Sequence, residues 1–352
     1  MKRIVALALA LLLALSSLIL PAMAEAPATV KTGVLLMLNL SEEEMSNYRK
    51  ARQLINVQLS REDYAKNLFR EALGEAGKGP ENYEIIYFDN LDAMLMSLNA
   101  GEIGTMEIYQ TTAEYLTHQN PELIQSVEYN IVDDAGDFAR AVKRGALSND
   151  FAFMMMESNT ALRDKFNEAL ASITEDEMNQ LIQDHITAAI NDGTVTPVEM
   201  PVIDGAETIK VAVTGSLPPM DYVAADGAPA GFNTALLAEI SKRINKNIEL
   251  VVVDSVGRAA ALASGTVDAV FWTRTNRTSN EMADEKLDSF REKLTDEELE
   301  TLRQVDELFD FKTYGKMDMP EGTIITTPYY SDLIVPVTTK ARLENVKAQA
   351  VN

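Results

Sequence analysis

The sequence predicts an α/β protein with two lobes, and three observations support this fold class. The chain has 352 residues, which is too many for one simple core and enough for two lobes. Short apolar runs of strand length alternate with amphipathic stretches of helix length, a pattern typical of sheets covered by helices. The composition, 46% hydrophobic and 24% charged, is that of a folded globular protein.

The first residues have the layout of a secretory signal peptide. Lys2 and Arg3 precede an uncharged apolar run over residues 4–20, and Ala22 and Ala24 follow with the spacing of a cleavage site. An uncleaved membrane anchor is the alternative, but the run is slightly short for a membrane span. We therefore expect cleavage after residues 1–24 and a periplasmic or secreted protein.

The net charge limits the kind of partner that the protein can bind, and the cysteine content limits what can stabilise its fold. The formal net charge is −23, and loss of the two basic residues with the signal peptide makes the mature chain more acidic still. Such a surface repels phosphate backbones, so no nucleic-acid partner is expected. The chain has no cysteine, which excludes both disulfides and a lipid-modified N-terminal Cys. A large core must therefore hold the fold.

The first half of the chain alternates between predicted strands and helices. Ser41 with Glu44, and Thr174 with Glu177, have the spacing of helix capping boxes, and Gly101 is expected to end a helix. Strands are predicted over 33–40, 83–88, 106–109 and 151–156, and helices from 41 and over 60–74, 91–100, 161–170 and 174–190.

A proline-rich linker over 194–207 separates the first half from the second, where the alternation resumes. A charged helical insertion is expected over 281–321, because its capping box and acidic face interrupt the alternation. Strands are predicted over 209–213, 248–253, 267–272 and 323–337, and helices over 231–244 and 255–263.

Three short motifs in the second half carry a family resemblance. They are Pro218-Pro219-Met220 after a strand, Gly231-Phe232 at the start of a helix, and Ser264-Gly265 followed by Asp268-Ala269 at a strand entry. Together they resemble the amino-acid-type solute-binding proteins of bacterial ABC transporters, which have the type II periplasmic-binding fold. The resemblance implies two lobes, each a mixed sheet flanked by helices, joined by a hinge that Thr327-Pro328-Tyr329-Tyr330 would supply. It also implies a monomer that binds a small amino-acid-like ligand, delivers it to a membrane permease and uses no cofactor.

The family's segments stand here in rotated order, which predicts a circular permutation. Residues 25–193 resemble lobe 2 and the terminal helices of lobe 1, and 194–207 form the linker. Residues 208–340 resemble the N-terminal part of lobe 1 with the insertion and the hinge strand, and 341–352 form a tail. Two degenerate tandem copies are the alternative. Permutation is preferred because each half supplies what the other lacks.

The resemblance also places candidate ligand-binding residues between the lobes. Tyr222 could stack on a ligand and Asp221 could pair with an ammonium group, unless both belong to an exposed turn. Asn233 could be a simple helix cap, and Trp272 could be core. Asn280 stands where the family has its carboxylate-binding Arg, so Arg274 or Arg277 would have to substitute, which puts an α-amino-acid ligand in question. The full candidate set is Ser41, Glu107, Tyr109, Met220, Asp221, Tyr222, Asn233, Trp272, Thr273, Thr275, Arg277 and Tyr329.

The sequence contains few residues or motifs that would support a catalytic function. The two histidines, His118 and His185, lack metal-ligand spacing, and no nucleophile elbow or phosphate-binding loop is present. We therefore predict no catalytic residue and no metal site. Two alternatives remain: a periplasmic dehydratase on the same fold, with Asp221 or Glu107 as general acid, and a ligand-sensing protein that acts on a membrane receptor.

Overall fold

The computed structural model describes residues 29–35, 82–125, 148–254, 257–275 and 321–344, with isolated residues 43, 47, 296, 299, 300, 303, 304 and 307. The signal peptide over 1–24, the helix expected over 60–74 and the start of the helix expected at Ser41 lie outside these ranges. So does most of the insertion expected over 281–321. None of the helices in the described part of the chain is long and apolar enough to cross a bilayer.

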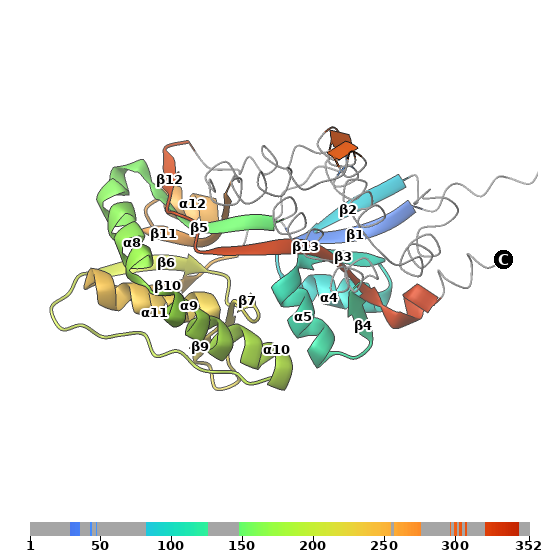
Figure 1. Ribbon diagram of the computed structural model, residues 1–352, viewed down its shortest axis with the longest axis horizontal. Coiled ribbons are helices and arrows are strands. Elements are labelled where there is room, and N and C mark those ends of the chain that lie inside the picture. Colours follow the sequence, from blue (N-terminus) through green and yellow to red (C-terminus); the bar gives the residue numbers. More distant parts are fainter. Residues whose placement is uncertain are drawn as a thin grey trace, which may run out of the picture.

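A long sheet runs through the molecule and divides into two lobes (Figure 1). Its strand order is β10-β6-β11-β5-β13-β3-β1-β2. Lobe 1 contains β6 (Thr208–Val213), β10 (Asn247–Val252), β11 (Ala269–Thr275), β5 (Ser148–Met156) and β12 (Thr323–Ile325). Lobe 2 contains β1 (Thr29–Leu35), β2 (Asn82–Phe88), β3 (Thr105–Tyr109), β4 (Leu123–Gln125) and most of β13 (Tyr330–Thr339).

The two lobes exchange one strand each. In lobe 1 the strands β10, β6 and β11 are parallel, and β5 pairs antiparallel with β11 although it follows the lobe 2 strands in the sequence. In lobe 2 the strands β2, β1 and β3 are parallel, and β13 pairs antiparallel with β3 although it follows the lobe 1 strands. Residues 330–333 of β13 also pair with β5, so the two exchanged strands lie side by side where the lobes meet.

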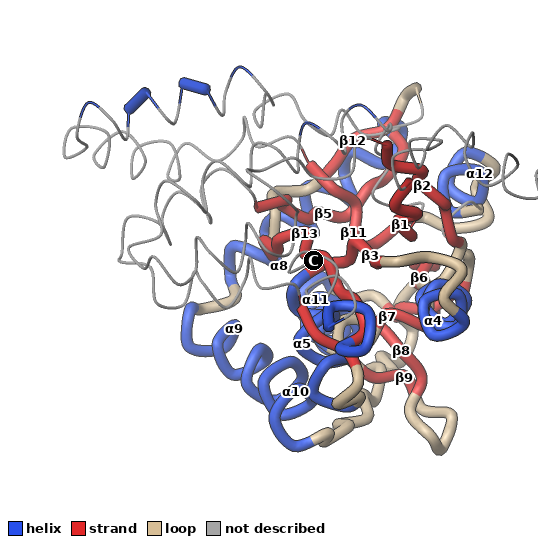
Figure 2. Tube along the Cα trace, turned by 90° about the vertical axis from the view of Figure 1, so that its right-hand side faces the viewer, coloured by secondary structure: helices blue, strands red, loops and turns tan. Residues whose placement is uncertain are grey.

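Helices cover the sheet on both sides. Lobe 2 has α4 (Leu91–Ala100) and α5 (Gln110–Gln119). Lobe 1 has α8 (Thr160–Ser172), α9 (Glu175–Ile182), α10 (Ala188–Asp192), α11 (Phe232–Ile244) and α12 (Arg258–Ala263). Figures 1 and 2 show α9, α10 and α11 on one side of the lobe 1 strands and α12 on the other. A small sheet of β7 (Ser216–Leu217), β8 (Asp221–Val223) and β9 (Pro229–Ala230) lies beside α11.

Several local predictions are confirmed. Gly101 ends α4 in the left-handed conformation at φ 75°. Thr174 and Glu177 form the predicted capping box at the start of α9. Gly231 precedes α11 at φ 102°, and a Cβ at this position would lie 2.6 Å from the carbonyl oxygen of Met220. Glycine is therefore required where the chain turns into α11.

Other predictions need correction. The helix expected over 174–190 contains a π-helical turn over Gln183–Thr187 that separates α9 from α10. The strand expected over 323–337 is two strands, β12 and β13. Between them residues 326–329 are irregular, and only the N–H groups of Thr326 and Tyr329 bond to the backbone of β5. Helix α5 and strand β4 were not predicted from the sequence.

The apolar core is continuous between the lobes. One buried cluster contains Val34 and Ile108 of lobe 2 together with Phe153, Val211 and Phe271 of lobe 1. The run at 151–156 is confirmed as a buried strand, since its first five residues are at most 5% exposed. Burying a large apolar side chain contributes roughly 1.5–3 kcal/mol, so this shared core favours contact between the two lobes.

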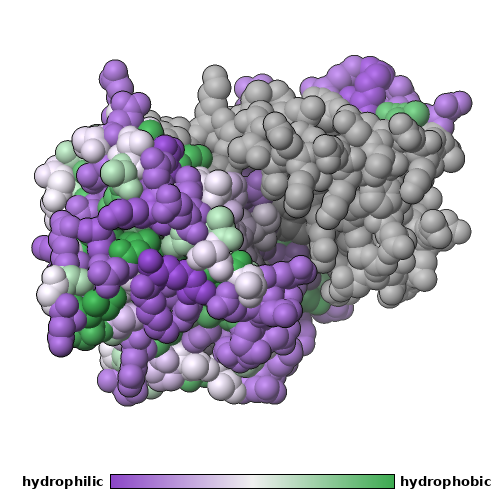
Figure 3. Space-filling model, turned by 60° about the vertical axis from the view of Figure 1, so that its left-hand side comes forward, coloured by the Kyte–Doolittle hydropathy of each residue, from purple (hydrophilic) through white to green (hydrophobic). Residues whose placement is uncertain are grey.

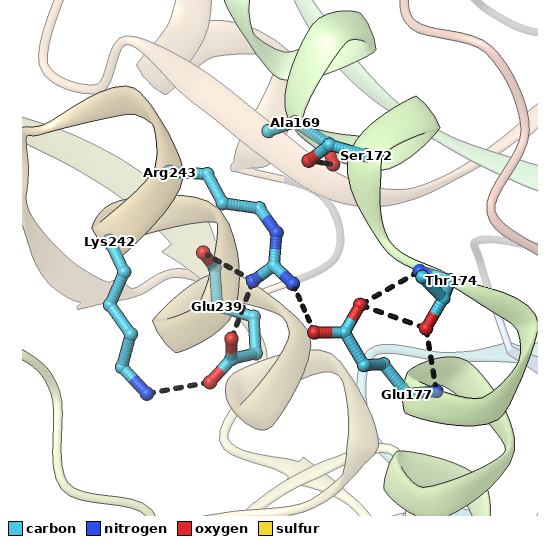
Figure 4. A network of polar contacts seen from close by, with 7 residues as sticks. All are labelled: Ala169, Ser172, Thr174, Glu177, Glu239, Lys242 and Arg243. Carbon is cyan, nitrogen blue, oxygen red and sulfur yellow. Dashed lines mark hydrogen bonds and ion pairs between the residues drawn. The ribbon is translucent and has the colours of Figure 1, made fainter.

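A network of ion pairs joins α9 to α11 on the surface (Figure 4). Arg243 contacts Glu177 at 2.9 Å and Glu239 at 2.5 Å, and Lys242 contacts Glu239 at 2.6 Å. Exposed pairs of this kind contribute about 0.2–1 kcal/mol each. Figure 3 shows mainly hydrophilic side chains around hydrophobic ones on the forward face of lobe 1, in keeping with the charged composition.

Candidate functional site

Four aromatic rings meet where the lobes join. Trp272 of β11 stacks on Phe151 of β5 with ring centroids 3.7 Å apart and planes 8° from parallel. The ring of Tyr109, from β3 in lobe 2, meets Phe151 edge-on at 4.8 Å and Trp272 at 5.9 Å. Tyr330 of β13 lies 5.7 Å from Trp272. The cluster therefore combines side chains from both lobes and both exchanged strands.

The backbone of Trp272 is irregular. Its φ is 51°, in the left-handed region, and the pairing of β11 with β5 shifts register between Val270 and Thr273. A bulge of this kind re-aims a side chain, and a left-handed conformation costs on the order of 1–3 kcal/mol outside glycine. The hydroxyl of Tyr329 accepts a hydrogen bond from the Trp272 backbone N–H at 3.1 Å. The fold thus holds the only Trp of the chain in a strained position at the junction.

Asp221 is buried, at 2% exposed, and is not part of an exposed turn. Its Oδ2 accepts hydrogen bonds from the backbone N–H and the hydroxyl of Thr214, both at 2.7 Å, and from the N–H of Gly215 at 3.0 Å. Burial raises the pKa of Asp221, and these hydrogen bonds oppose the rise. Oδ2 therefore holds the 214–215 turn. The predicted pairing of Asp221 with a ligand ammonium group stays a prediction, and it would use the other carboxylate oxygen, Oδ1.

Arg258 is the principal polar residue that the sequence reading missed. It is the first residue of α12 and only 8% exposed, and its Nη1 donates to the carbonyl oxygen of Phe271 at 3.0 Å. Burial lowers the pKa of Arg258, while attraction to Asp221, Tyr329 and Tyr109 opposes this change. The sequence contained one signal that could have identified this residue, an Arg in the otherwise apolar helix segment RAAALA, since charged residues on a buried face are rare.

Asn233 is fully buried and is not the helix cap that one interpretation suggested. Gly231 occupies the cap position of α11, and neither side-chain amide atom of Asn233 has a hydrogen-bond partner among the described residues. The backbone N–H of Asn233 donates to the carbonyl oxygen of Met220 at 2.8 Å. Since Met220 precedes Asp221, this bond ties Asn233 to the same buried loop.

The two lobes also touch through a pair of tyrosines farther out. The ring of Tyr115 on α5 lies 6.4 Å from that of Tyr222 on β8, and both side chains are half-buried. Burial, together with the proximity of Tyr115, raises the pKa of Tyr222 to about 12. Nearby, the Gln119 amide on α5 donates to the carbonyl oxygen of Ala189 on α10 at 3.4 Å. Lobe 2 thus packs against lobe 1 through α5.

The lobe 2 side of the junction is held by the exchanged strand β13. The N–H of Thr111, in the first turn of α5, donates to Asp332 Oδ2 at 3.2 Å, and the hydroxyls of Thr111 and Tyr330 bond at 2.9 Å. Glu107 and Tyr109 of β3 are both 1% exposed, and only the Tyr109 ring joins the aromatic cluster. A carboxylate at a helix N-terminus is stabilising, so Asp332 fixes the start of α5.

The remaining candidates are less informative. Thr273 is buried in β11, and Thr275 lies in the same strand without a described side chain. Ser41 and Arg277 lie outside the described residues. Arg274, the other proposed substitute for the missing Arg, is buried at 5% exposed. Within the described ranges, no group of three or more His, Asp or Glu side chains is arranged to hold a metal ion.

A comparison with protein families matches part of the chain. Residues 209–282 match the family model of bacterial extracellular solute-binding proteins, family 3. This segment contains β6, the small sheet, α11, β10, α12 and β11, which carry Asp221, Asn233, Arg258 and Trp272. A search of curated proteins found no match to the sequence.

Solved structures that the chain matches include two ligand-binding proteins and a periplasmic domain. The ligand-binding component of an ABC-type import system from Staphylococcus aureus, with zinc bound, is 10% identical with a TM-score of 0.36, over 92% of this chain and 70% of that one. The periplasmic domain of BvgS from B. pertussis is 14% identical with a TM-score of 0.35, over 94% and 40%. The periplasmic aliphatic sulphonate binding protein SsuA from Escherichia coli is 10% identical with a TM-score of 0.32, over 92% and 70%.

Proposed function

We propose that the protein is an extracytoplasmic solute-binding protein that captures a small polar ligand, such as an amino acid or a related compound, between its two lobes. The observation that carries the proposal is the junction itself. Trp272 of lobe 1 meets Tyr109 of lobe 2 there, the buried Arg258 of lobe 1 is attracted electrostatically to Tyr109, and two adjacent exchanged strands connect the lobes. Ligand sites occur preferentially at such boundaries between lobes, where a few polar groups stand among aromatic ones.

The match of residues 209–282 supports this proposal because it covers the part of lobe 1 that contains the buried residues Asp221, Asn233, Arg258 and Trp272. In the proposed function, the exported protein acts as a monomer and delivers its ligand to the membrane permease of an ABC transporter. Closure of the lobes about the two exchanged strands would bury the ligand, as in other hinged binding proteins. No catalytic step is part of the proposal.

We further propose that the chain is a circular permutant of this fold. The strands β1 and β13, near the two ends of the described chain, lie in the same lobe with only β3 between them. The linker over 194–207 joins α10 to β6, and both belong to lobe 1. Both features are expected if the family's chain ends were joined in lobe 1 and a new break were opened in lobe 2.

Thermal unfolding of the mature protein, from Glu25 onward, tests the binding function. The panel contains amino acids, small carboxylates, small amines, sugars and oligopeptides. A ligand that binds only the folded state raises stability by about 2.7 kcal/mol at a concentration 100 times its dissociation constant. The proposal predicts a raised unfolding midpoint with one chemical class. An unchanged midpoint with every member of the panel would contradict it.

A further inference from the structure

Three Asp-Gly pairs occur in the chain, at residues 192–193, 204–205 and 226–227. Such pairs are prone to rearrangement, because glycine has no side chain to hinder attack of its backbone nitrogen on the preceding carboxyl group. All three pairs are exposed to solvent. Sequence and exposure therefore do not distinguish them, and the local structure decides which pair can react.

Two of the pairs are held by hydrogen bonds. Asp192 is the last residue of α10, and the N–H of Gly193 donates to the carbonyl oxygen of Ala188. The N–H of Gly227 also donates to a backbone carbonyl oxygen, at 2.9 Å, and the Asp226 carboxylate accepts from a backbone N–H at 3.0 Å. These bonds must break before the glycine nitrogen can turn toward the carboxyl carbon, so the fold protects both pairs.

The pair Asp204-Gly205 lacks this protection. Its two residues form the centre of a turn in the linker, which the N–H of Ala206 closes on the carbonyl oxygen of Ile203 at 3.1 Å. Gly205 has a φ of 74°, as in the third residue of a type II turn. Among the described residues, neither the Asp204 carboxylate nor the Gly205 N–H has a hydrogen-bond or ion-pair partner. A Cβ at Gly205 would meet no atom within 4 Å, so the space beside the pair is open.

We propose that Asp204 is a site of spontaneous isomerisation to isoaspartate. The backbone nitrogen of Gly205 attacks Cγ of Asp204 and loses its proton, a carboxyl oxygen leaves as water, and a succinimide ring forms. A water molecule then opens the ring at either carbonyl and yields aspartate or isoaspartate. The water released in the first step balances the water consumed in the second, and no electrons are exchanged. The inference is independent of the proposed ligand-binding function.

Isomerisation at this position loosens the attachment of the linker to lobe 1. The Asn247 side chain bonds to the N–H and the carbonyl oxygen of Ile203 and to the carbonyl oxygen of Ala206, on the two sides of the pair. Isoaspartate places the side-chain methylene of Asp204 in the main chain, which lengthens the path between these two bonded residues. The three bonds of Asn247 then no longer fit the turn together, and proteases gain access to the linker.

Ageing of the mature protein, from Glu25 onward, tests the site. The protein is kept at neutral pH and physiological temperature, digested, and analysed by mass spectrometry with electron-based fragmentation, which distinguishes isoaspartate from aspartate. Isoaspartate should accumulate at Asp204 several times faster than at Asp192 or Asp226. In protein kept unfolded in urea the three rates should be similar, because the fold no longer protects the other two pairs.

An isotope and two variants identify the reaction. Ageing in water enriched in heavy oxygen should place the isotope in the modified residue, because ring opening takes up solvent oxygen. Asp204→Glu keeps the charge but needs a larger, less favourable ring, so the modification at this position and the rise in linker proteolysis with age should both disappear. Asp226→Glu is the matched control and should age like the parent protein.

The inference is refuted if folded protein forms isoaspartate at equal rates in all three pairs, or fastest at Asp192 or Asp226. It is also refuted if the folded protein forms none at Asp204 while the unfolded chain does. A rise in linker proteolysis with age that persists in Asp204→Glu would contradict the proposed consequence for the linker. No ligand takes part in these measurements, so each outcome leaves the solute-binding proposal to its own test.

Discussion

The backbone N–H of Trp272 donates a hydrogen bond to the hydroxyl of Tyr329 across 3.1 Å and so connects β11 with the segment that leads into β13. Tyr329 is also held by its own N–H, which bonds to the carbonyl oxygen of Phe151 at 2.9 Å. One tyrosine therefore joins β11, β5 and the crossing segment. Since both exchanged strands pass this point, its geometry affects the position of the whole junction.

Removal of the Tyr329 hydroxyl should destabilise the protein. In a Tyr329→Phe variant the buried N–H of Trp272 loses its acceptor, and an unsatisfied buried donor costs about 1–3 kcal/mol. Denaturant unfolding at equilibrium measures the loss. Tyr222→Phe is the matched control, because no hydrogen bond of the Tyr222 hydroxyl is present among the described residues, and its stability should change by less than about 0.5 kcal/mol. Equal losses in the two variants would contradict this role.

The linker is fixed to lobe 1 by Asn247. The Asn247 amide oxygen accepts from the N–H of Ile203 at 2.7 Å, and its Nδ2 donates to the carbonyl oxygens of Ile203 and Ala206 at 3.1 and 3.2 Å. An Asn247→Ala variant should lose about 1–3 kcal/mol of unfolding free energy, because three bonds disappear together. Limited proteolysis should cut the linker faster as well. Asn179→Ala, at an exposed position of α9, should have neither effect.

Glu177 gives the surface network a pH dependence. Hydrogen bonds from Thr174, with a smaller contribution from Arg243, lower the pKa of Glu177 below its ordinary value of 4.5. A carboxyl whose pKa is lowered in the folded state stabilises the protein above the unfolded pKa and stops doing so as the pH falls through the folded pKa. Glu177→Gln should therefore be less stable than the parent near pH 7, and the difference should shrink and disappear as the pH falls through the lowered folded-state pKa of Glu177.

The same stability measurement on Glu168→Gln provides the control. Glu168 is exposed on α8 and forms no ion pair with the described residues, so its substitution should leave the parent's pH profile unchanged. A difference between Glu177→Gln and the parent that persists undiminished in acid would show that the carboxylate charge is not the cause.

The proposed permutation predicts that the chain can be reconnected. A variant that runs from Glu207 to Asn352, continues through a short flexible linker to Glu25 and ends at Gly193 restores the order of the resembling family. Exposed loops tolerate new chain ends, so this variant should unfold cooperatively and keep the ligand response of the parent. A chain that cannot fold in this order, while an insertion of the same linker after Gly205 of the parent is tolerated, would contradict the permutation.

Much of lobe 1 could be predicted from the sequence because its signals are local. Gly231 must be glycine for steric reasons, and the capping box of α9 involves residues three apart. Helix α5 was missed because the residue at its cap position, Tyr109, makes no side-chain capping hydrogen bond to the first turn. Its start is held instead by Asp332, which is 221 positions away in the sequence. No local pattern could indicate that contact.

In the candidate site, too, some features could be predicted from the sequence and others depend on contacts between distant segments. Asp221, Asn233, Trp272, Tyr109 and Tyr329 were predicted from the resemblance. Tyr109, Trp272 and Tyr329 lie together where the lobes join, and the Asn233 backbone bonds to the loop that carries Asp221. Arg258 was missed because its importance depends on burial beside Asp221, which comes from a different loop. The committed hydrogen bonds of Asp221 Oδ2 also depend on the folded 214–215 turn. Residue types could be assigned from sequence, but their free or occupied hydrogen-bonding groups could not.

Closure of the two lobes around a ligand is the central claim, and a crosslink between Tyr115 and Tyr222 tests it most directly. Their rings lie 6.4 Å apart across the lobes, and the chain has no other cysteine to interfere with a Tyr115→Cys, Tyr222→Cys double variant. The variant is loaded with a radiolabelled ligand from the thermal panel, treated with a short bismaleimide and passed through a desalting column. The account predicts that the crosslinked protein retains the ligand while the uncrosslinked protein releases it. Equally fast release from both forms would contradict capture between the lobes.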